Sequence, residues 1–522
     1  MGLSRTESPK TSGQPWEDLI RKHDLGLPRY EAFYKDLHQN PELSLQEHKT
    51  AAKIVAFLQD LCSDLEIKTG IGGNGLIAIL RNGAGKTVLL RADMDALPLL
   101  EKTSLEYASQ EKAVDSEGKT VPVMHACGHD FHVTCLLGAA DVIISHRQTW
   151  SGTVVFLFQP AEEGYDGAKS MVNDGLYSRH ECPIPDLVLG QHVGAIRAGV
   201  VSLKKGPLLA ASDVWKVTIH GIGGHGSSPQ NCIDPIVVAA HIVVRLQTIV
   251  SREVPPSELA VVSVCSLHAG SAQNIISDTA EFLLNIRSTS LEWRTRILTS
   301  AERIIRAECS AGKCNCPRDP TIELTHSVPL VLNDAAVTQP IADSFVSYFG
   351  HNFLNDLPVI TGSEDFSNLA RAINAPYCFW FFGGHEPLEF DEHHKQGTLT
   401  ELPVNHSSYS LLAIKSQASS YVDCGFSRRK PLKSTIDFQG NNHIMEAKAT
   451  LMLGEARSYT VQINYKVVYP TGTLLLSLNT EQRSELHSRG YKSKSVGKKK
   501  AEQQHYSRDC LTEALQDNTA RT

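Results

Sequence analysis

The 522-residue sequence lacks any run of about 18 apolar residues, so no transmembrane helix is expected. It also lacks a secretory hydrophobic region, because residues 1–25 are polar. The twelve cysteines are scattered along the chain, which predicts a reducing, cytoplasmic compartment and no disulfide framework. The net charge of −7 supplies no global attraction to nucleic acid or to a membrane surface, so we expect neither partner.

The most informative stretch runs from Met124 to His132 and holds a thiol, three imidazoles and a carboxylate. Cys127 and His129 are two residues apart, so on an irregular loop both side chains can converge on one divalent metal ion. We expect Asp130 or His132 to accept the second N–H of a liganding imidazole and to fix its tautomer. The alternative is a reduced thiol beside ordinary surface histidines.

Three short apolar runs, each expected to be a buried strand, end in further ligand-type residues. The runs with the residues that follow them are 87–92 with Asp93 and Asp95, 153–158 with Glu162 and Glu163, and 186–189 with His192. The carboxyl ends of parallel strands meet at one edge of an open α/β sheet. The side chains of adjacent glutamates diverge, so one can ligate a metal while the other reaches a water. A metal site at the carboxyl edge of a sheet is therefore predicted, with His406 as a late candidate ligand.

The middle of the chain predicts a separate domain. Its expected elements, in the order strand, helix, strand, strand, helix, strand, are 213–220, 234–252, 259–267, 279–288, 291–307 and 321–325. This order is typical of ferredoxin-like domains. Because ligand candidates lie on both sides of it, we interpret 210–324 as an insertion into an α/β catalytic domain.

The catalytic domain is expected to comprise residues 26–209 and 325–424, with a mostly parallel sheet and helices on both faces. Residues 1–25 are expected to form a flexible lead. Residues 425–522 are rich in polar and basic side chains and are expected to form a disordered or poorly packed tail. Within that tail, 461–468 and 472–478 have the composition of strands.

Five motifs together resemble those of a known family. They are Arg91-Ala-Asp-Met-Asp-Ala-Leu-Pro98, His125-Ala-Cys-Gly-His-Asp130, Phe158-Gln-Pro-Ala-Glu-Glu-Gly164, Gly223-Gly-His-Gly-Ser-Ser-Pro229 and Gly362-Ser-Glu-Asp-Phe366. Over about residues 28–410 the chain resembles the amidohydrolase branch of the aminoacylase–carboxypeptidase metallopeptidase family. Members of that branch include hippurate hydrolases and plant indole-acetyl-amino-acid hydrolases. The set of motifs, in this order, is highly specific.

The resemblance implies two divalent metal ions per chain, manganese or zinc, and a set of residues that act with them. The implied metal ligands are Cys127, His129, Glu163, His192 and His406, the implied general base is Glu162, and the implied contacts to the substrate carboxylate or transition state are His225, Asn274 and Arg287. The inserted domain is implied to be a lid and the surface of a homodimer. The chain departs from the family where Ser408 follows the late His-Ser pair in place of the usual Pro, and Ser277 also replaces a usual Pro.

The implied activity is hydrolysis of the amide bond of N-acyl amino acids of acetyl, benzoyl or indole-acetyl type, by a metal-bound water with Glu162 as base. A dipeptidase or carboxypeptidase of the same family stays open, as does a catalytically impaired binding homologue. A cysteine hydrolase with Cys127 as nucleophile and His129 or His132 as base would leave the two glutamates and His192 unexplained. A structural zinc site is a further alternative.

Overall fold

The computed structural model describes His23, residues 26–164, 167–314, 318–355 and 357–410, and the backbone of four strands between 436 and 482. The four strands belong to a compact unit of their own, within Ser427–Arg508. They are β19 Ile436–Gly440, β20 His443–Leu453, β21 Tyr459–Tyr469 and β22 Gly472–Gln482, paired antiparallel in that order. β21 and β22 cover the two runs with strand composition, whereas the polar tail as a whole stays a prediction.

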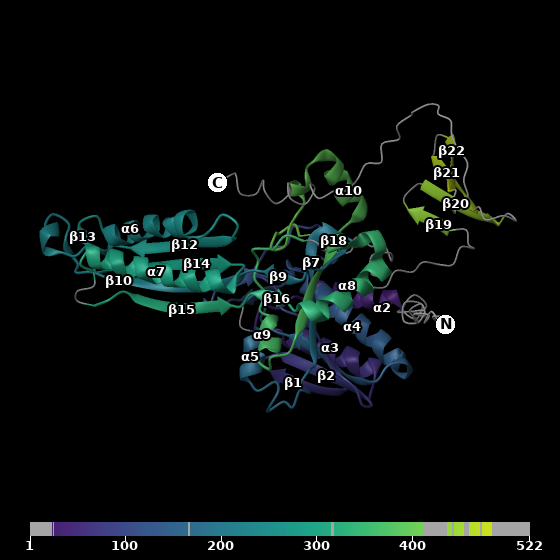
Figure 1. Ribbon diagram of the computed structural model, residues 1–522, viewed down its shortest axis with the longest axis horizontal. Coiled ribbons are helices and arrows are strands. Elements are labelled where there is room, and N and C mark those ends of the chain that lie inside the picture. Colours follow the sequence, from purple (N-terminus) through teal and green to yellow (C-terminus); the bar gives the residue numbers. More distant parts are fainter. Residues whose placement is uncertain are drawn as a thin grey trace, which may run out of the picture. The chain divides into compact units, whose positions relative to one another are not determined.

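An eight-stranded mixed sheet forms the centre of the larger unit (Figure 1). Its order is β1 Glu66–Ile71, β2 Gly75–Asn82, β6 Gly152–Gln159, β3 Thr87–Asp93, β7 Leu187–Arg197, β18 Tyr377–His385, β8 Val201–Ser202 and β17 Phe353–Leu354. The central strands β6, β3, β7 and β18 are parallel. β1 and β2 pair antiparallel with their neighbours, and β8 pairs antiparallel with β18 but parallel with β17. The predicted α/β class is confirmed.

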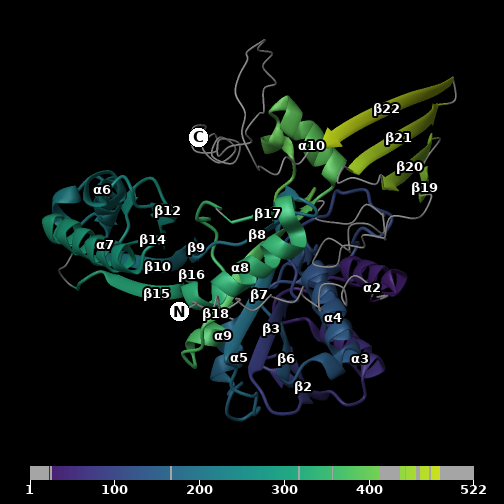
Figure 2. The same ribbon diagram turned by 45° about the vertical axis from the view of Figure 1, so that its right-hand side comes forward.

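Helices cover both faces of this sheet (Figure 2). On one face lie α2 Leu27–Gln39, α3 His48–Leu61 and α4 His129–Ser145, and on the other lie α5 Gly167–Asn173 and α9 Ser367–Arg371. Strand β2 shows the reason, because successive side chains of a strand point to opposite faces. Leu76, Ala78 and Leu80 pack with α3 and α4, while Ile77 and Ile79 pack with α5 and α9. A strand buried on both faces reads as one continuous apolar run.

The inserted region forms a four-stranded antiparallel sheet with two helices packed beside each other on it (Figure 1). In chain order its elements are β10 Ala211–His220, α6 Pro235–Thr248, β12 Ala260–Ala269, β14 Thr279–Ser288, α7 Leu291–Ala311 and β15 Thr321–Val328. The sheet order, β12-β14-β10-β15, is that of a ferredoxin-like fold, as predicted. The boundaries at 210 and 324 and the role as a lid stay predictions.

Helix α6 and the π-helical turn η3 after it, Ile249–Glu253, form the one described helix that is long and apolar enough to cross a membrane. Val238, Ile242 and Leu246 on its inner face are buried in the core of the insert. A helix that packs one apolar face in a protein core can have the same length and composition as a membrane-spanning helix.

The remaining described elements are short strands and turns together with the two helices α8 and α10. They are β4 Lys112–Val114, β5 Thr120–Pro122, η1 Arg147–Thr149, β9 Gly206–Leu209, β11 Gly224–His225, η2 Pro229–Asn231, β13 Ile275–Ile276, β16 Val331–Asn333, α8 Ala335–Phe349, η4 Gly350–Asn352, α10 Pro387–Gln396 and η5 Leu399–Glu401.

Some elements differ from the expectations based on sequence. Helix α3 begins only at His48, because Leu45 just before it has a left-handed backbone (φ 68°) that cannot continue a helix. Strand β1 was not expected, since it is an edge strand whose residues are mostly exposed or half-buried. Helix α10 was also not expected, because none of its residues is buried and it lacks an apolar stripe. The last part of the predicted catalytic domain, 411–424, lies outside the described residues.

Candidate metal centre

Five side chains meet beside the carboxyl ends of β3 and β6, next to the middle of β7, where His192 lies. The Sγ atom of Cys127 lies 3.4 Å from Nε2 of His192 and 3.3 Å from Nε2 of His406. The same His406 nitrogen lies 3.4 Å from Oε1 of Glu163. One ligand atom each from Cys127, His129 and Glu163 lie within 4.8 Å of one another. The structure therefore brings together all five residues of the predicted ligand set.

Local backbone geometry explains how two of these side chains share one loop. Gly128 has a φ of 79° and is the N-cap residue of α4. This left-handed conformation is readily available only to glycine. The turn at Gly128 lets the chain present Cys127 immediately before the helix and His129 in its first turn.

Two of the histidines have one ring nitrogen fixed by a hydrogen bond and the other turned to the cluster. Nδ1 of His129 lies 2.9 Å from the carbonyl oxygen of Asp95 and 3.1 Å from its carboxylate. Nδ1 of His192 lies 2.7 Å from the carbonyl oxygen of Val193. Such partners fix the tautomer and leave Nε2 with a lone pair for a metal.

The prediction that Asp130 or His132 would accept these N–H groups is wrong. Asp130 instead pairs with His38, with 2.7 Å between Oδ2 and Nδ1. His132 uses both nitrogens elsewhere: Nδ1 lies 2.5 Å from Oδ1 of Asp93, and Nε2 accepts the backbone N–H of Val193 at 2.8 Å. With both nitrogens occupied, His132 supports the strand that carries His192 and is not available as a ligand.

Glu162, the predicted general base, lies in a buried group of carboxylates. Oxygen atoms of Glu162, Glu364 and Asp365 lie within 4.8 Å of one another. Burial, followed by the charges of Glu364 and Glu163, raises the pKa of Glu162 well above its ordinary value. Burial and the neighbouring Glu364 also raise the pKa of Asp365 to about 8.

The buried cation Arg91 balances this group. Its Nη2 donates to Oε1 of Glu364 at 2.8 Å, and its Nη1 donates to Oδ2 of Asp93 at 2.7 Å. Its Nε donates to Oε1 of Gln159 at 2.9 Å. A buried charge is tolerated only when it is paired and hydrogen-bonded in this way. Arg91 and Glu364 both lie in the motifs named above, but nothing in the sequence indicates that the two residues pair.

The three predicted substrate contacts on the insert do not come together in one chain. Nη1 of Arg287 donates to the carbonyl oxygen of Thr361 at 2.7 Å and to Oγ of Ser363 at 3.2 Å, beside the Glu364 loop. His225 and Asn274 are exposed; His225 lies in β11, and Asn274 immediately precedes its partner strand β13.

Strand length separates that pair from Arg287. β11 and β13 adjoin the Thr279 end of β14, where Gly221 N–H donates to the Asp278 carbonyl at 2.8 Å. Arg287 lies eight residues further along the same strand, which at about 3.3 Å per residue corresponds to roughly 26 Å. Among the described residues, no hydrogen bond or ion pair joins His225 or Asn274 to the Cys127 cluster.

The cluster has the properties of a metal-binding site. Nε2 of His129 and Oε1 of Glu163 are buried and have no hydrogen-bond partner in the part of the chain that the structure describes. Buried polar atoms normally have partners, and an unsatisfied one indicates an unseen ion or water. Imidazole, thiolate and carboxylate are together a donor set for divalent transition metals. The residues present therefore fit such ions.

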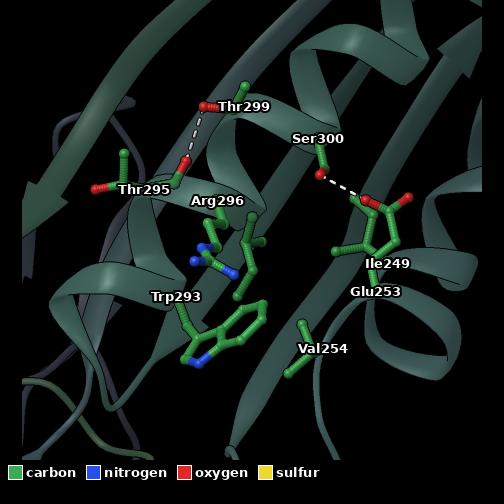
Figure 3. Close-up of a pocket in the computed structure, with 9 residues that line it drawn as sticks. Ile249, Glu253, Val254, Trp293, Thr295, Arg296, Thr299 and Ser300 are labelled. Atoms are coloured by element: carbon green, nitrogen blue, oxygen red, sulfur yellow. Dashed lines mark hydrogen bonds between the residues drawn. The ribbon is translucent and has the colours of Figure 1, made fainter.

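A separate cavity of about 380 Å³ lies on the insert between η3 and α7 (Figure 3). Its one carboxylate, Glu253, accepts from Ser300 at 2.6 Å and pairs with Arg303 at 2.8 Å. The cavity is lined by none of the predicted ligands. It therefore adds nothing to the metal centre.

Comparison with known proteins relates this geometry to a family. The model of peptidase family M20/M25/M40 matches residues 89–411. The chain is 33% identical over 392 residues to thermostable carboxypeptidase 2 of Saccharolobus solfataricus, covering 73% of this chain and 93% of the relative. It is 37% identical over 358 residues to hippurate hydrolase of Campylobacter jejuni, covering 67% and 87%. Among solved structures, the Bacillus subtilis YXEP protein, a dinuclear metal-binding peptidase of the M20 family, matches with a TM-score of 0.56 at 29% identity, covering 68% of this chain and 88% of that one.

Proposed function

Because the chain belongs to peptidase family M20/M25/M40 and is a metal-dependent hydrolase of amide bonds, we propose that its substrates are N-acyl amino acids. The observation that carries the proposal is the meeting of Cys127, His129, Glu163, His192 and His406 beside the buried Glu162. A relative named for the hydrolysis of hippurate supports the choice of substrate class.

We assign two divalent ions, manganese or zinc, to the five ligands. When bound, such ions lower the pKa of a water and polarise a carbonyl group. Cys127 would hold the ions together with His192 and His406, since its sulfur lies within 3.4 Å of both imidazoles. The structurally similar YXEP protein is a dinuclear metal-binding peptidase, which supports the number of ions.

Glu162 moves the protons. It takes a proton from the attacking water and returns it to the leaving amine, which turns a poor leaving group into a neutral one. A group that does both works best when its pKa is near the working pH. Burial and the adjacent Glu364 shift the pKa of Glu162 upward from that of an ordinary carboxyl, in the required direction.

Arg287 recognises the free carboxylate of the substrate. A guanidinium group matches a planar carboxylate with two parallel hydrogen bonds. In the described conformation its Nη1 is satisfied by Thr361 and Ser363, at the edge of the loop that carries Glu364. The substrate carboxylate therefore binds next to the loop that carries Glu364. On binding it replaces the hydrogen bonds that Arg287 makes to Thr361 and Ser363.

A second copy of the chain supplies His225 and Asn274, and the insert provides the dimer surface. β12 is an edge strand of the inserted sheet, with backbone groups available for pairing. Its Leu267 and the α6 residues Val237 and Val244 are exposed apolar side chains on the same domain, which a partner subunit would cover. Sedimentation should give a dimer at micromolar concentration, and a monomer would contradict this arrangement.

A carboxypeptidase or dipeptidase activity is the second candidate, because one relative is named a carboxypeptidase. One panel decides between them. N-acetyl, N-benzoyl and N-indole-acetyl amino acids are assayed beside dipeptides, with Mn²⁺ or Zn²⁺ supplied. Turnover of the N-acyl amino acids is expected. Turnover of dipeptides alone would replace the proposal with a peptidase.

A chelator arm tests the remaining alternative, a cysteine hydrolase with Cys127 as the nucleophile. Removal of metal should abolish turnover, and re-addition should restore it. Activity that survives chelation would favour the thiol mechanism.

A further inference from the structure

The carboxylate of Glu47 is fully buried and is bonded to a backbone far away in sequence. Its Oε1 accepts the backbone N–H of Ala161 at 2.8 Å and that of Leu45 at 2.9 Å. Its Oε2 accepts from Nδ2 of Asn74 at 3.0 Å. Burial of a carboxylate is costly unless hydrogen bonds of this kind compensate for lost hydration. Because Ala161 immediately precedes Glu162, Glu47 connects the start of α3 to the turn that carries the general base.

The turn that Glu47 holds is strained. Ala161 has a φ of 51°, in the left-handed region that residues other than glycine seldom adopt. Such conformations cost of order 1–3 kcal/mol and persist only where the surroundings impose them. The Ala161 side chain is buried, so the left-handed backbone is held by surrounding protein atoms and not by solvent. The hydrogen bond from the Ala161 N–H to Glu47 is one of the interactions that impose it.

A second buried carboxylate holds the other side of Glu162. Oδ2 of Asp95 accepts the backbone N–H of Glu163 at 2.9 Å and the hydroxyl of Ser44 at 2.6 Å. The residues before and after the base are thus each fixed by a buried acceptor. Asp95 also binds His129, so its loss would disturb the metal ligands directly. Glu47 has no hydrogen bond to any of the five proposed ligands, which separates its effect from theirs.

We propose that Glu47 is a positioning residue for Glu162. By holding Ala161 in the left-handed conformation, it sets the direction in which the Glu162 side chain leaves the backbone. This inference rests on the proposed role of Glu162 as general base. A shift of about 1 Å in a catalytic group can reduce turnover by roughly a hundredfold.

The test compares Glu47→Gln with Glu42→Gln. Glu42 is the matched control because it also accepts a backbone N–H at the start of α3, from Thr50 at 2.8 Å, but does not bond to the Glu162 turn. In Glu47→Gln an amide group replaces one acceptor oxygen. We expect kcat to fall about 10- to 100-fold with little change in KM or metal content. Glu42→Gln should keep the wild-type kcat. Equal losses in the two variants, or no loss in Glu47→Gln, would overturn the proposal.

Ala161→Gly distinguishes positioning from a general loss of structure. Glycine adopts a positive φ without strain. The Glu47→Gln change should therefore reduce kcat less in the Ala161→Gly background than in the wild-type background. An equal reduction of kcat in both backgrounds would contradict the proposal. A purely structural role of Glu47 would not be compensated by a glycine at position 161. Glu47→Asp, which keeps the charge but withdraws it by one methylene group, takes the place of Glu47→Gln if that variant does not fold.

Hydrogen exchange separates this inference from the substrate assignment. In the metal-loaded protein, the segment 158–164 should exchange faster in Glu47→Gln than in wild type, and at the wild-type rate in Glu42→Gln. Unchanged exchange in Glu47→Gln would overturn the positioning role whatever the substrate is. If exchange is faster in Glu47→Gln but the wild-type protein cleaves no N-acyl amino acid, Glu47 still holds the turn. Only the proposed function is then wrong.

Discussion

The metal centre and the inserted domain differ in how firmly their proposed functional side chains are held. At the centre, His129 and His192 each have one ring nitrogen fixed by a hydrogen bond, which leaves the other beside Cys127. On the insert, His225 and Asn274 are exposed, and in the described structure their hydrogen bonds stay within and beside the β11–β13 pair. One chain thus brings the five proposed ligands together, whereas the proposed substrate contacts His225 and Asn274 would need a partner that approaches them.

Arg287 lies between these two extremes. It belongs to the insert, but its Nη1 is bonded to Thr361 and Ser363 of the catalytic domain. The end of the insert that carries Arg287 is therefore hydrogen-bonded to the loop before Glu364. Among the described residues, no such bond joins the His225 end to the metal centre. From this comparison we expect substitutions at the metal centre to reduce metal content or turnover, and substitution of Arg287 to weaken substrate binding. We expect His225 to act only in a dimer.

The largest expected effect follows from Cys127→Ala. Its sulfur contacts two of the other ligands, so its loss should reduce the metal content of the purified protein from two ions per chain and abolish turnover. Cys135→Ala is the matched control, because Cys135 lies on α4 but is not in the cluster. Metal analysis of the two variants checks this prediction. Equal metal content in Cys127→Ala and wild type would remove Cys127 from the ligand set.

Glu162→Gln should have the next largest effect. The amide cannot carry a proton between water and amine, so kcat should fall about 10²–10⁴-fold if the residue acts only as general acid and base. Both ions should remain, since Glu163 is the proposed ligand. Steady-state kinetics and metal analysis of one preparation test both statements. A variant with near-normal kcat would place the base elsewhere.

Arg287→Ala should act on binding more than on chemistry. Hydrogen bonds between charged groups contribute about 1.5–3 kcal/mol, so kcat/KM for N-acyl amino acids should fall roughly 10- to 100-fold, mostly through KM. The matching amides, which lack the free carboxylate, should be affected little. Arg197→Ala is a control, because Arg197 pairs with Asp391 and is not a predicted substrate contact. An Arg287→Ala enzyme as efficient as wild type would contradict the clamp.

Mixed dimers show whether His225 acts across the subunit interface. Neither His225→Ala nor Glu162→Gln alone should be active. If His225 serves the partner's site, a mixed dimer contains one site with an intact Glu162 and an intact His225 from the other subunit, so mixing should restore activity. If it serves its own site, each site keeps a defect. Mixtures that stay inactive after subunit exchange would therefore contradict action across the interface.

The sequence predicted the buried parts of the fold better than its edges. β3 and β6 were predicted because strands covered on both faces leave a continuous apolar run, and the family resemblance is confirmed. β1 and α10 were missed because neither has a buried stripe. The structure brings the five ligand candidates together, as the motifs suggested. The strand predicted to end before His192 instead continues to Arg197, so His192 lies within β7.

Long-range polar pairs were beyond reach from one sequence. Arg91 and Glu364 are 273 residues apart, and Glu47 and Ala161 are 114 apart. No periodicity or short motif links such pairs, because only the closed fold places them in contact. The remoteness of His225 from Arg287, in contrast, follows from the length of β14, which the sequence did predict.

The smallest expected effect concerns a buried histidine at the rim of the centre. His38 of α2 lies between two carboxylates, with 2.7 Å from Nδ1 to Asp130 and 3.1 Å from Nε2 to Glu101. Burial acts to lower the pKa of His38, but the hydrogen bonds to Asp130 and Glu101 outweigh it and raise the pKa to about 9. The charged imidazole thereby connects α2 to the first turn of α4, next to His129.

The sign of the resulting pH dependence follows from linkage. A pKa that is higher in the folded than in the unfolded state contributes stability that is fully present below the unfolded value, about 6.5, and is lost as pH rises through the folded value. The free energy of unfolding of the metal-free protein should therefore fall between about pH 6.5 and 9, by roughly 1–3 kcal/mol from this group. His38→Gln should lose that part of the slope, and His48→Gln, at an exposed position on α3, should keep it. Urea unfolding of the three proteins across this range measures the difference, and equal slopes for wild type and His38→Gln would show that His38 is not charged in the folded state.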